Sequence, residues 1–300
     1  MPIVIPKALP AYEILTNEKI FVMPKLRAEN QDIRPIEIAI LNLMPTKIDT
    51  ETQLMRLLGN TSLQVNVTLI GTETYKGHYT SQSHMETFYT TFSSIKDKNF
   101  DGMIITGAPV EQMRFEDVQY WKELQEIMDW TETHVTSTIY ICWGAYAALY
   151  HFYGIEKHNF DKKLFGVYPI KACDDYELLL KGMDDTMYMP MSRYNTVDQD
   201  KVFSNPNIKV LAYGEDCGIA IAKSVDNKKF FLTGHSEYDR TTLKTEYLRD
   251  IEKGLKIDKP LNYFINDDIN KIDMKWKSTA NLIYYNWLNY YVYQVTPYEL

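Results

Sequence analysis

A nearly continuous aliphatic run at positions 36–43 limits what this chain can fold into more than any other segment. The run, Ile36-Glu-Ile-Ala-Ile-Leu-Asn-Leu43, is typical of a strand buried on both faces, and such strands occur in parallel sheets that helices cover on both sides. Thr46 and Asp49 then have the spacing of a helix-capping box, and leucines follow at helical spacing before Gly59. Apolar residues alternate from Leu63 to Leu69, so we expect a right-handed βαβ unit here.

The alternation of strands and helices continues as far as Gly154. Residues 101–109 and 135–141 predict two further buried strands. Between them, apolar residues at helical spacing predict an amphipathic helix, and residues 145–152 predict another that Gly154 ends. We therefore expect an α/β fold with a mainly parallel sheet flanked by helices, in one domain over residues 1–300 with N- and C-terminal extensions.

The segments outside this alternation are less regular. Residues 72–87 predict a long polar surface loop, and residues 161–194 predict irregular binding loops. Three strands are expected at 208–213, 218–224 and 229–233, with a hairpin turn between the last two and a helix after them. The tail from Ser278 to Gln294 is rich in aromatic residues, which indicates a C-terminal helix packed on the body or on a second subunit. A homodimer is therefore left open.

Composition limits the kinds of partner that the chain can bind and the cellular compartment that suits it. The chain has 32 basic and 40 acidic side chains and a formal charge of −8, which disfavours a nucleic-acid partner and requires a locally basic pocket for any acidic substrate. The three cysteines form no C-x-x-C pair, and no H-E-x-x-H motif is present, so we expect neither a disulfide framework nor a metal site. We find no signal peptide and no apolar run long enough to span a membrane, so we expect a cytoplasmic protein with no membrane partner.

The richest passage for chemistry is the one around Cys142, where a predicted buried strand runs directly into a predicted helix. Helix-start amides at such a turn can stabilise a thiolate or an oxyanion, although a free cysteine can equally be an inert core residue. His235 follows another predicted strand, and Glu237 lies two residues further on. Because the ends of neighbouring parallel strands meet at one edge, His235 could accept the Cys142 proton while Glu237 orients the imidazole ring. A surface histidine is the alternative.

Six separated segments occur in order along essentially the whole chain: Asn42–Lys47, Thr106–Glu111, Tyr140–Ala145, Lys163 with Gly166–Tyr168, Pro190–Arg193 and Gly234–Tyr238. Together they resemble the homoserine O-acyltransferase family of methionine biosynthesis, which has a class I glutamine amidotransferase-like fold. One departure concerns glutamine amidotransferases, which usually have glycine two residues before the nucleophile. Tyr140 occupies that position here, and no synthetase domain accompanies the chain, so the sequence argues against ammonia-releasing chemistry.

The resemblance implies a role for each matching residue. Cys142 is then the nucleophile that takes the acyl group from an acyl-coenzyme A, with His235 as general base and Glu237 as its orienting partner. The Lys47 side chain and the Trp143 amide resemble the oxyanion stabilisers of the family, although a cation near a helix N-terminus opposes the helix dipole. Four further positions are associated with L-homoserine: Lys163, Ser192, Arg193 and Arg249.

The acyl donor is expected to be acetyl-coenzyme A, with no resident cofactor, because of Glu111. In the family, glutamate at this position goes with acetyl donors and glycine goes with succinyl donors. A succinyl group would place its carboxylate beside that of Glu111. The expected function is thus homoserine O-acetyl transfer, and the alternatives are homoserine O-succinyl transfer, a cysteine hydrolase or glutaminase of the same fold, or a non-catalytic sensor of small molecules.

Overall fold

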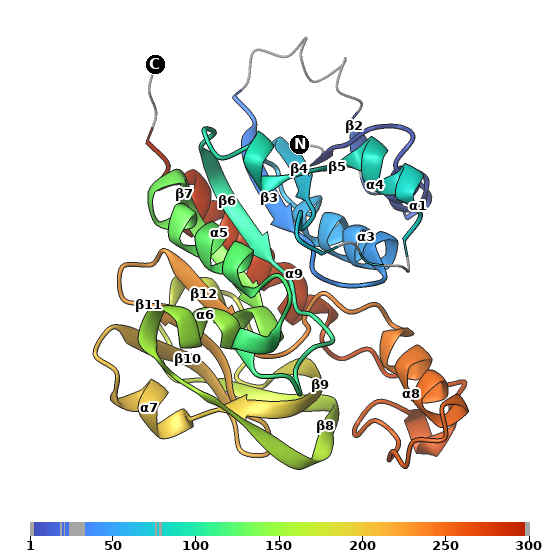
Figure 1. The fold of residues 1–300 in the computed structure, drawn as a ribbon. Helices are drawn as coiled ribbons and strands as arrows, with labels where there is room; N and C mark the ends of the chain where they lie inside the picture. Colours follow the sequence, from blue (N-terminus) through green and yellow to red (C-terminus); the bar gives the residue numbers. More distant parts are fainter. Residues whose placement is uncertain are drawn as a thin grey trace.

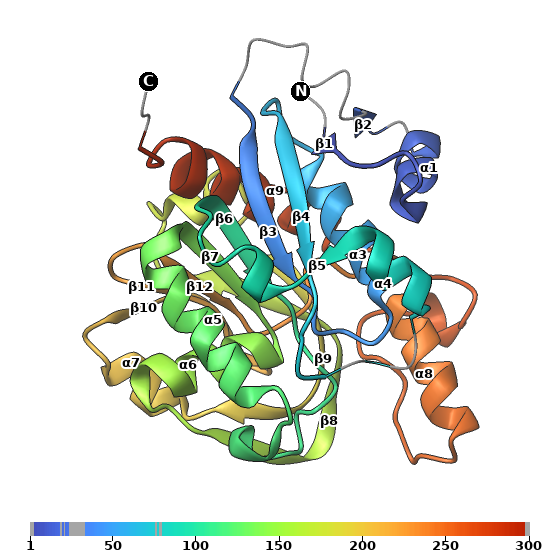
Figure 2. The same cartoon turned by 45° about the horizontal axis from the view of Figure 1, so that its top comes forward.

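The computed structural model describes residues 3–18, 20, 22–23, 34–75, 77 and 80–297. In these ranges, a 12-stranded sheet runs through the molecule in the order β2-β1-β4-β3-β6-β7-β12-β11-β10-β8-β9, and β5 pairs with β4 outside this path (Figure 1). Helices cover both faces of the sheet, and Figure 2 shows α5 in front of it and α9 behind it. The predicted α/β class with a mainly parallel sheet is therefore confirmed.

The parallel half of the sheet contains the buried strands that the sequence predicts. Its strands are β1 (Ile3–Val4), β2 (Val22–Met23), β3 (Ile36–Leu41), β4 (Val65–Ile70), β5 (Tyr89–Thr90), β6 (Phe100–Ile105), β7 (Val135–Ile141) and β12 (Lys229–Leu232). All residues of β6 and β12 are buried, which explains why these segments are mostly apolar. The neighbours β3, β6, β7 and β12 are parallel, so their carboxyl ends lie along one edge.

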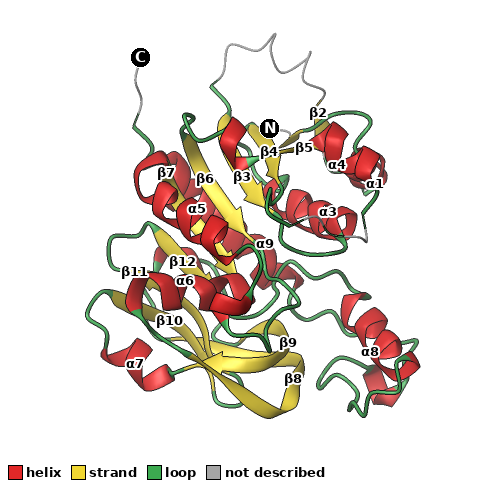
Figure 3. Cartoon of the chain, in the orientation of Figure 1, coloured by secondary structure: helices red, strands yellow, loops and turns green. Residues whose placement is uncertain are grey.

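The antiparallel half completes the sheet and corrects one prediction. Its strands are β8 (Lys157–Ala172), β9 (Met187–Val197), β10 (Ile208–Gly214) and β11 (Gly218–Ser224). The predicted hairpin between β11 and β12 is confirmed, and Asn227 takes the positive φ of 64° that its turn needs. The prediction of irregular loops over 161–194 is wrong for β8 and β9, which pair as a long antiparallel hairpin (Figure 3).

Local chemistry explains why this hairpin escaped prediction. Buried and less buried positions alternate over most of β9, but the buried Arg193 and Asn195 are polar, and prolines at 169 and 190 and a glycine at 166 interrupt the hairpin. Gly166 has a φ of 148°, and a β-carbon there would lie 2.4 Å from the backbone nitrogen of Leu261. The glycine is therefore required by a crossing segment and does not mark a loop.

Two sets of helices pack on the two faces of the sheet. Apolar side chains of α1 (Pro10–Asn17), α3 (Lys47–Leu58), α8 (Thr242–Glu252) and α9 (Lys277–Asn286) join one core, and those of α5 (Trp121–His134), α6 (Trp143–Tyr153) and α7 (Gln199–Ser204) join the other. Short 3₁₀ turns occur at Phe92–Ser94, Phe115–Asp117, Leu178–Leu180 and Ile265–Asp267. As predicted, Gly154 ends α6 in the left-handed conformation, with φ 65°. The helices in the described ranges all fall short of the length and apolarity that a bilayer-spanning segment requires.

The predicted surface loop at 72–87 is also corrected. Residues Gln82–Phe88 form α4, whose N-terminal residue Ser81 accepts a hydrogen bond from the His84 amide at 3.3 Å. The His84 side chain is buried. A helix this short and this polar has no apolar periodicity to detect, which is why sequence analysis missed it. Residues 76, 78 and 79 lie outside the described residues.

The aromatic tail packs on the body of the chain. After α9, a π-helical segment covers Trp287–Tyr293. The Trp287 ring is fully buried, its Nε1 donates to Ser137 Oγ at 2.9 Å, and a β-carbon on Gly102 would lie 2.8 Å from its ring. The tail therefore covers β6 and β7 from one face, which fixes the position of the strands that lead to the candidate site.

We predict that Trp287→Ala lowers the free energy of unfolding by about 3–5 kcal/mol, because it removes a fully buried ring and leaves a cavity beneath the sheet. Denaturant unfolding of the purified protein measures this change. Tyr285→Ala is the matched control, since Tyr285 lies on the same segment with 39% exposure and should cost far less. Equal losses for the two variants would contradict the packing described here.

Candidate active site

The candidate site lies where four neighbouring parallel strands end. The amide of Cys142, directly after β7, donates to the carbonyl of Leu232 at the end of β12 at 2.7 Å. A β-carbon on Gly107, just beyond β6, would lie 3.4 Å from Cys142 Cβ and 3.6 Å from His235 Cε1. Cys142 and His235 therefore both border the space beside the same glycine. The structure brings these two predicted residues together, and the small size of Gly107 makes room for both.

Cys142 occupies a strained turn between β7 and α6. Its backbone has φ 48° and ψ −114°, a conformation that residues other than glycine rarely adopt. Gly144 makes the turn fit, since a β-carbon there would lie 2.7 Å from the carbonyl oxygen of Thr106. The first amides of a helix have no partner within the helix, so the Trp143 amide can serve an oxyanion. The Trp143 side chain itself is fully buried against Phe115.

His235 is held on two sides. Its Nδ1 donates to Glu237 Oε1 at 2.7 Å, and its ring stacks on Tyr238 with centroids 4.2 Å apart. Burial opposes a charged imidazole, but the charges of Cys142 and Glu237 and hydrogen bonds with both raise the pKa of His235 well above its usual value. The arrangement therefore favours an imidazolium next to the sulfur, which is the protonation state that a cysteine nucleophile needs from its partner.

The two other cysteines are poorer candidates for a nucleophile. Cys217 is buried, and burial raises the pKa of its thiol to about 11. Cys173 is exposed, yet partial burial of its thiol raises the pKa there as well. Both thiols are therefore mostly protonated at neutral pH, and a protonated thiol is a weak nucleophile.

Lys47 begins α3 just beyond β3 and turns back toward the strand end. Its Nζ donates to the carbonyl of Asn42 at 2.6 Å and to that of Met44 at 3.3 Å. Burial lowers the pKa of Lys47 to about 8, and the charge of Glu51 opposes this change. The ammonium is thus held at the rim of the site by backbone carbonyls and supported by a buried carboxylate.

Sequence analysis missed the group that supports Lys47. Glu51 is fully buried, and its Oε1 lies 3.0 Å from His84 Nε2 and accepts from the Tyr89 hydroxyl at 2.5 Å. The same hydroxyl accepts from Asn42 Nδ2 at 2.9 Å. A glutamate in a helix normally faces solvent, and its partner His84 comes from the segment expected to be a loop, so no sequence signal pointed to this network.

A second charged cluster lies next to the histidine. The Tyr238 hydroxyl donates to Glu246 Oε1 at 2.8 Å, and the Ser192 hydroxyl donates to Glu246 Oε2 at 2.5 Å. Lys163 Nζ lies 3.5 Å from Glu246 Oε2 and 3.1 Å from Asp250 Oδ2. Two predicted substrate residues, Ser192 and Lys163, therefore meet here, together with two carboxylates that the sequence did not single out.

Arg249 joins the same cluster, whereas Arg193 does not. Arg249 donates from Nη2 to Asp250 Oδ1 at 2.7 Å, and its side chain is half exposed. Arg193 is fully buried and donates to the carbonyls of Asn195 and Cys217 at 2.6 and 2.7 Å. Neighbouring residues of a strand point to opposite faces, so Arg193 points away from the face that Ser192 uses. Its substrate role stays a prediction, and its contacts here hold the backbone.

Glu111 lies between the two groups of charges. Its Oε2 accepts from the Tyr194 amide at 3.1 Å. Burial raises the pKa of Glu111, while that amide and the charges of Lys163 and His235 act in the opposite direction. The role of Glu111 in donor choice stays a prediction. In the described ranges, no three His, Cys, Asp or Glu side chains meet in a way that could hold a metal ion.

Solved structures with a similar fold show the class of this protein. A glutamine amidotransferase from Thermotoga maritima matches with a TM-score of 0.58 and 11% sequence identity, covering 87% of this chain and 100% of that one. A glutamine amidotransferase from Methylobacillus flagellatus matches with a TM-score of 0.54 and 14% identity, covering 86% and 95%. The fold is therefore class I glutamine amidotransferase-like, as predicted.

Sequence comparison then narrows the class to a family. Residues 2–298 match the homoserine O-succinyltransferase family. A homoserine O-acetyltransferase from Acetivibrio thermocellus is 54% identical over 301 residues, which cover 100% of this chain and 99% of the relative. One from a Geobacillus species is 55% identical over 300 residues, with 100% and 99% coverage. The chain belongs to the homoserine O-succinyltransferase family, so the predicted family and the predicted acyltransferase activity are both confirmed.

We predict that Lys47→Ala lowers kcat by about 100-fold to 1,000-fold, as expected for loss of one oxyanion donor. In the unchanged enzyme, activity should fall as pH rises past about 8, because Lys47 then loses its proton. Glu51→Gln removes the negative charge that stabilises the Lys47 ammonium. The fall in activity should therefore begin at a lower pH in this variant. Glu86→Gln, an exposed change on α4, is the control. A Glu51→Gln profile that coincides with the control profile would contradict the proposed support.

Proposed function

We propose that this chain transfers the acetyl group of acetyl-coenzyme A to the hydroxyl of L-homoserine through an acyl-cysteine. The observation that carries the proposal is the buried group of Cys142, His235 and Glu237 at the ends of β7 and β12. Full-length relatives named homoserine O-acetyltransferase support the choice of acceptor and donor. The likeness to glutamine amidotransferases is below 15% identity and concerns the fold alone, so it does not favour a glutaminase.

In the first half-reaction, the Cys142 thiolate attacks the thioester carbonyl of acetyl-coenzyme A. The negative charge moves to the carbonyl oxygen, where the Lys47 ammonium and the Trp143 amide stabilise it. The intermediate collapses by breaking the bond to the coenzyme A sulfur, and the His235 imidazolium gives that sulfur its proton. The enzyme then carries an acetyl thioester on Cys142 and a neutral His235.

In the second half-reaction, His235 takes the proton of the homoserine hydroxyl as that oxygen attacks the acetyl-cysteine. The bond from the acetyl carbon to Cys142 breaks, and the thiolate and imidazolium of the resting enzyme are restored. Glu237 holds the ring by its Nδ1 and stabilises the imidazolium in both halves. Coenzyme A leaves before homoserine reacts, and Cys142 carries the acetyl group in between, so the reaction is ping-pong.

The charged cluster around Glu246 suits the zwitterion of homoserine. A carboxylate needs a cation, which Lys163 and Arg249 can supply, and an ammonium needs acceptors, which Glu246 and Asp250 can supply. Ser192 adds a hydroxyl bonded to Glu246. Without substrate, these groups form ion pairs with one another. Homoserine would bind by replacing these internal pairs with ion pairs to its own carboxylate and ammonium groups.

The remaining expectations are part of the same proposal. We place the chain in the cytoplasm, because its three cysteines are all free, as is typical of a reducing compartment. Side chains and the co-substrate acetyl-coenzyme A account for every proton and bond in the mechanism, so the proposal includes no resident cofactor. We treat residues 1–300 as one catalytic domain, because a single sheet contains both the strands of the nucleophile and the strands of the charged cluster. A homodimer stays an open expectation.

We predict that Cys142→Ala folds but forms no O-acetylhomoserine, because the acetyl group has no acceptor on the enzyme. A coupled assay for free coenzyme A, with acetyl-coenzyme A and L-homoserine, measures this loss. Cys173→Ala removes an exposed thiol and should keep the full rate. An active Cys142→Ala enzyme would rule out the acyl-cysteine route.

We expect His235→Asn to lower kcat by about 100-fold to 10,000-fold, since it removes the general acid and base of both half-reactions. Glu237→Gln should cost less, because the ring loses only its orientation and the stabilisation of its charged form. Steady-state kinetics of the two variants give the comparison. If Glu237→Gln is the more damaging change, or if either variant keeps the normal rate, the assigned roles are wrong.

Donor choice is expected to depend on Glu111. At about 4 Å and an effective dielectric constant of about 20, a succinyl carboxylate would meet about 4 kcal/mol of repulsion from this side chain. Even half of that gives about 30-fold preference for acetyl transfer. Glu111→Gly should therefore gain succinyl transfer, measured as kcat/KM for the two thioesters.

Glu111→Gln separates the two causes of this preference. It removes the charge and keeps the size, so a partial gain of succinyl transfer would assign the remainder to bulk. The account of Glu111 fails if the unchanged enzyme already prefers succinyl-coenzyme A, or if the glycine variant keeps the original ratio.

A further inference from the structure

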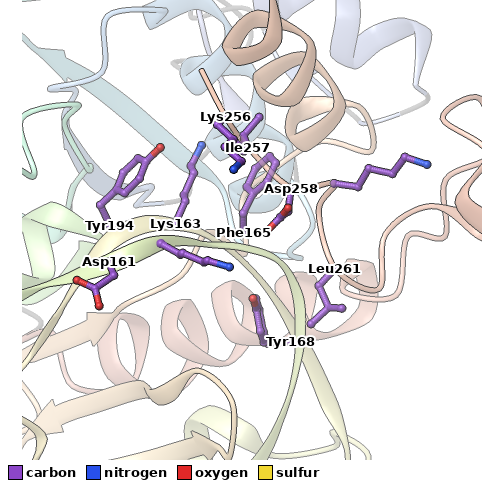
Figure 4. Close-up of a pocket in the computed structure, with 11 residues that line it drawn as sticks. Asp161, Lys163, Phe165, Tyr168, Tyr194, Lys256, Ile257, Asp258 and Leu261 are labelled. Carbon is purple, nitrogen blue, oxygen red and sulfur yellow. The ribbon is translucent and has the colours of Figure 1, made fainter. Parts of the chain in front are cut away.

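A cavity of about 500 Å³ opens between the β8–β9 hairpin and the segment that follows α8 (Figure 4). Its charged lining consists of four lysines and two aspartates: Lys162, Lys163, Lys256, Lys259, Asp161 and Asp258. The chain as a whole carries a formal charge of −8, so this cavity is a local excess of positive charge on an acidic protein. Such a site concentrates anionic ligands.

Two of the four lysines are available to a ligand. Lys163 lies near Asp250, and Lys259 Nζ lies 3.8 Å from Asp267 Oδ1. Lys162 and Lys256 are exposed, and neither forms an ion pair with a carboxylate in the part of the chain that the structure describes. Their ammonium groups can therefore pair with an anion without first breaking an internal contact.

The walls of the cavity are aromatic. Lys163 Nζ lies 4.2 Å from the ring centroid of Phe165 and 5.9 Å from that of Tyr194, and Figure 4 shows the lysine between these two rings. Tyr168 lines the same cavity. Aromatic rings beside cations are suited to a nucleotide, whose base can stack while its phosphates pair with ammonium groups.

The cavity adjoins the candidate active site through shared contacts. Its residue Lys163 lies 3.5 Å from Glu246, which accepts from the hydroxyl of Tyr238, the residue stacked on His235. Its residue Tyr194 donates its amide to Glu111. A long ligand anchored in the cavity can therefore extend along these residues toward His235.

We propose that this cavity binds the phosphorylated nucleotide end of the acyl donor, with Lys162 and Lys256 pairing with its phosphates. The inference rests on the proposed function, which makes the donor a coenzyme A thioester. Homoserine is a poor match, since it is small and has no net charge, whereas the nucleotide of coenzyme A carries a diphosphate and a 3′-phosphate. The remaining pantetheine arm would bring the thioester to Cys142.

Kinetics of the double variant Lys162→Ala/Lys256→Ala test the proposal. The KM for acetyl-coenzyme A should rise at least about tenfold, as expected from loss of charge-assisted bonds to phosphate. The kcat and the KM for homoserine should stay unchanged. Transfer from S-acetyl-pantetheine, which lacks the nucleotide, should also stay unchanged. The control is Lys98→Ala/Lys122→Ala, which removes two exposed lysines that do not line this cavity.

A binding measurement separates this proposal from the proposed function. In the Cys142→Ala background, calorimetry with adenosine 3′,5′-bisphosphate should show binding that weakens at least about tenfold in the double lysine variant. Equal affinity in both proteins, an unchanged KM for acetyl-coenzyme A, or an equal loss with S-acetyl-pantetheine would overturn the cavity assignment while leaving acetyl transfer intact. Nucleotide binding to this protein, combined with no acetyl transfer by the unchanged enzyme, would instead overturn the proposed function.

Discussion

One backbone hydrogen bond joins the two halves of the candidate active site. The Cys142 amide donates to the carbonyl of Leu232, and this bond continues the parallel pairing of β7 with β12 by one step beyond the strands. A slip of one residue between these strands would send each side chain to the opposite face. The nucleophile and His235 meet because that register is fixed, and the His235 amide adds a second tie by donating to the carbonyl of Pro190 on β9 at 2.8 Å.

Charge pairing explains how so many ionisable groups can be buried around this point. Three buried cations have a carboxylate nearby: His235 faces Glu237, Lys163 faces Asp250, and Lys47 is influenced by the buried Glu51. A buried ion is costly alone, and its partner offsets much of that cost. Lys162 and Lys256 lie next to these pairs and form no ion pair with a carboxylate within the described ranges, which is why the adjoining cavity suits an anion.

The sequence was most informative where one local rule decides the structure. β7 and the end of α6 follow from a β-branched run and from Gly154, and both are found as predicted. Prediction failed where contacts between distant parts of the chain determine the structure. The β8–β9 hairpin depends on pairing between distant segments and contains two prolines and a glycine, and α4 is short and polar. Among the site residues, Cys142, His235 and Glu237 could be found from their places after strands. Glu246, Asp250 and Glu51 could not, because helical carboxylates become visible as partners only when the tertiary structure is known.

The central claim is that Cys142 becomes acetylated while His235 serves as its acid and base. The most direct measurement is the mass of the intact protein after incubation with acetyl-coenzyme A in the absence of homoserine, followed by peptide mapping. The account predicts one added acetyl group, located on Cys142, that is lost when L-homoserine is supplied. An unmodified protein that still produces O-acetylhomoserine, or an acetyl group on Cys173 or Cys217 that homoserine removes, would contradict it.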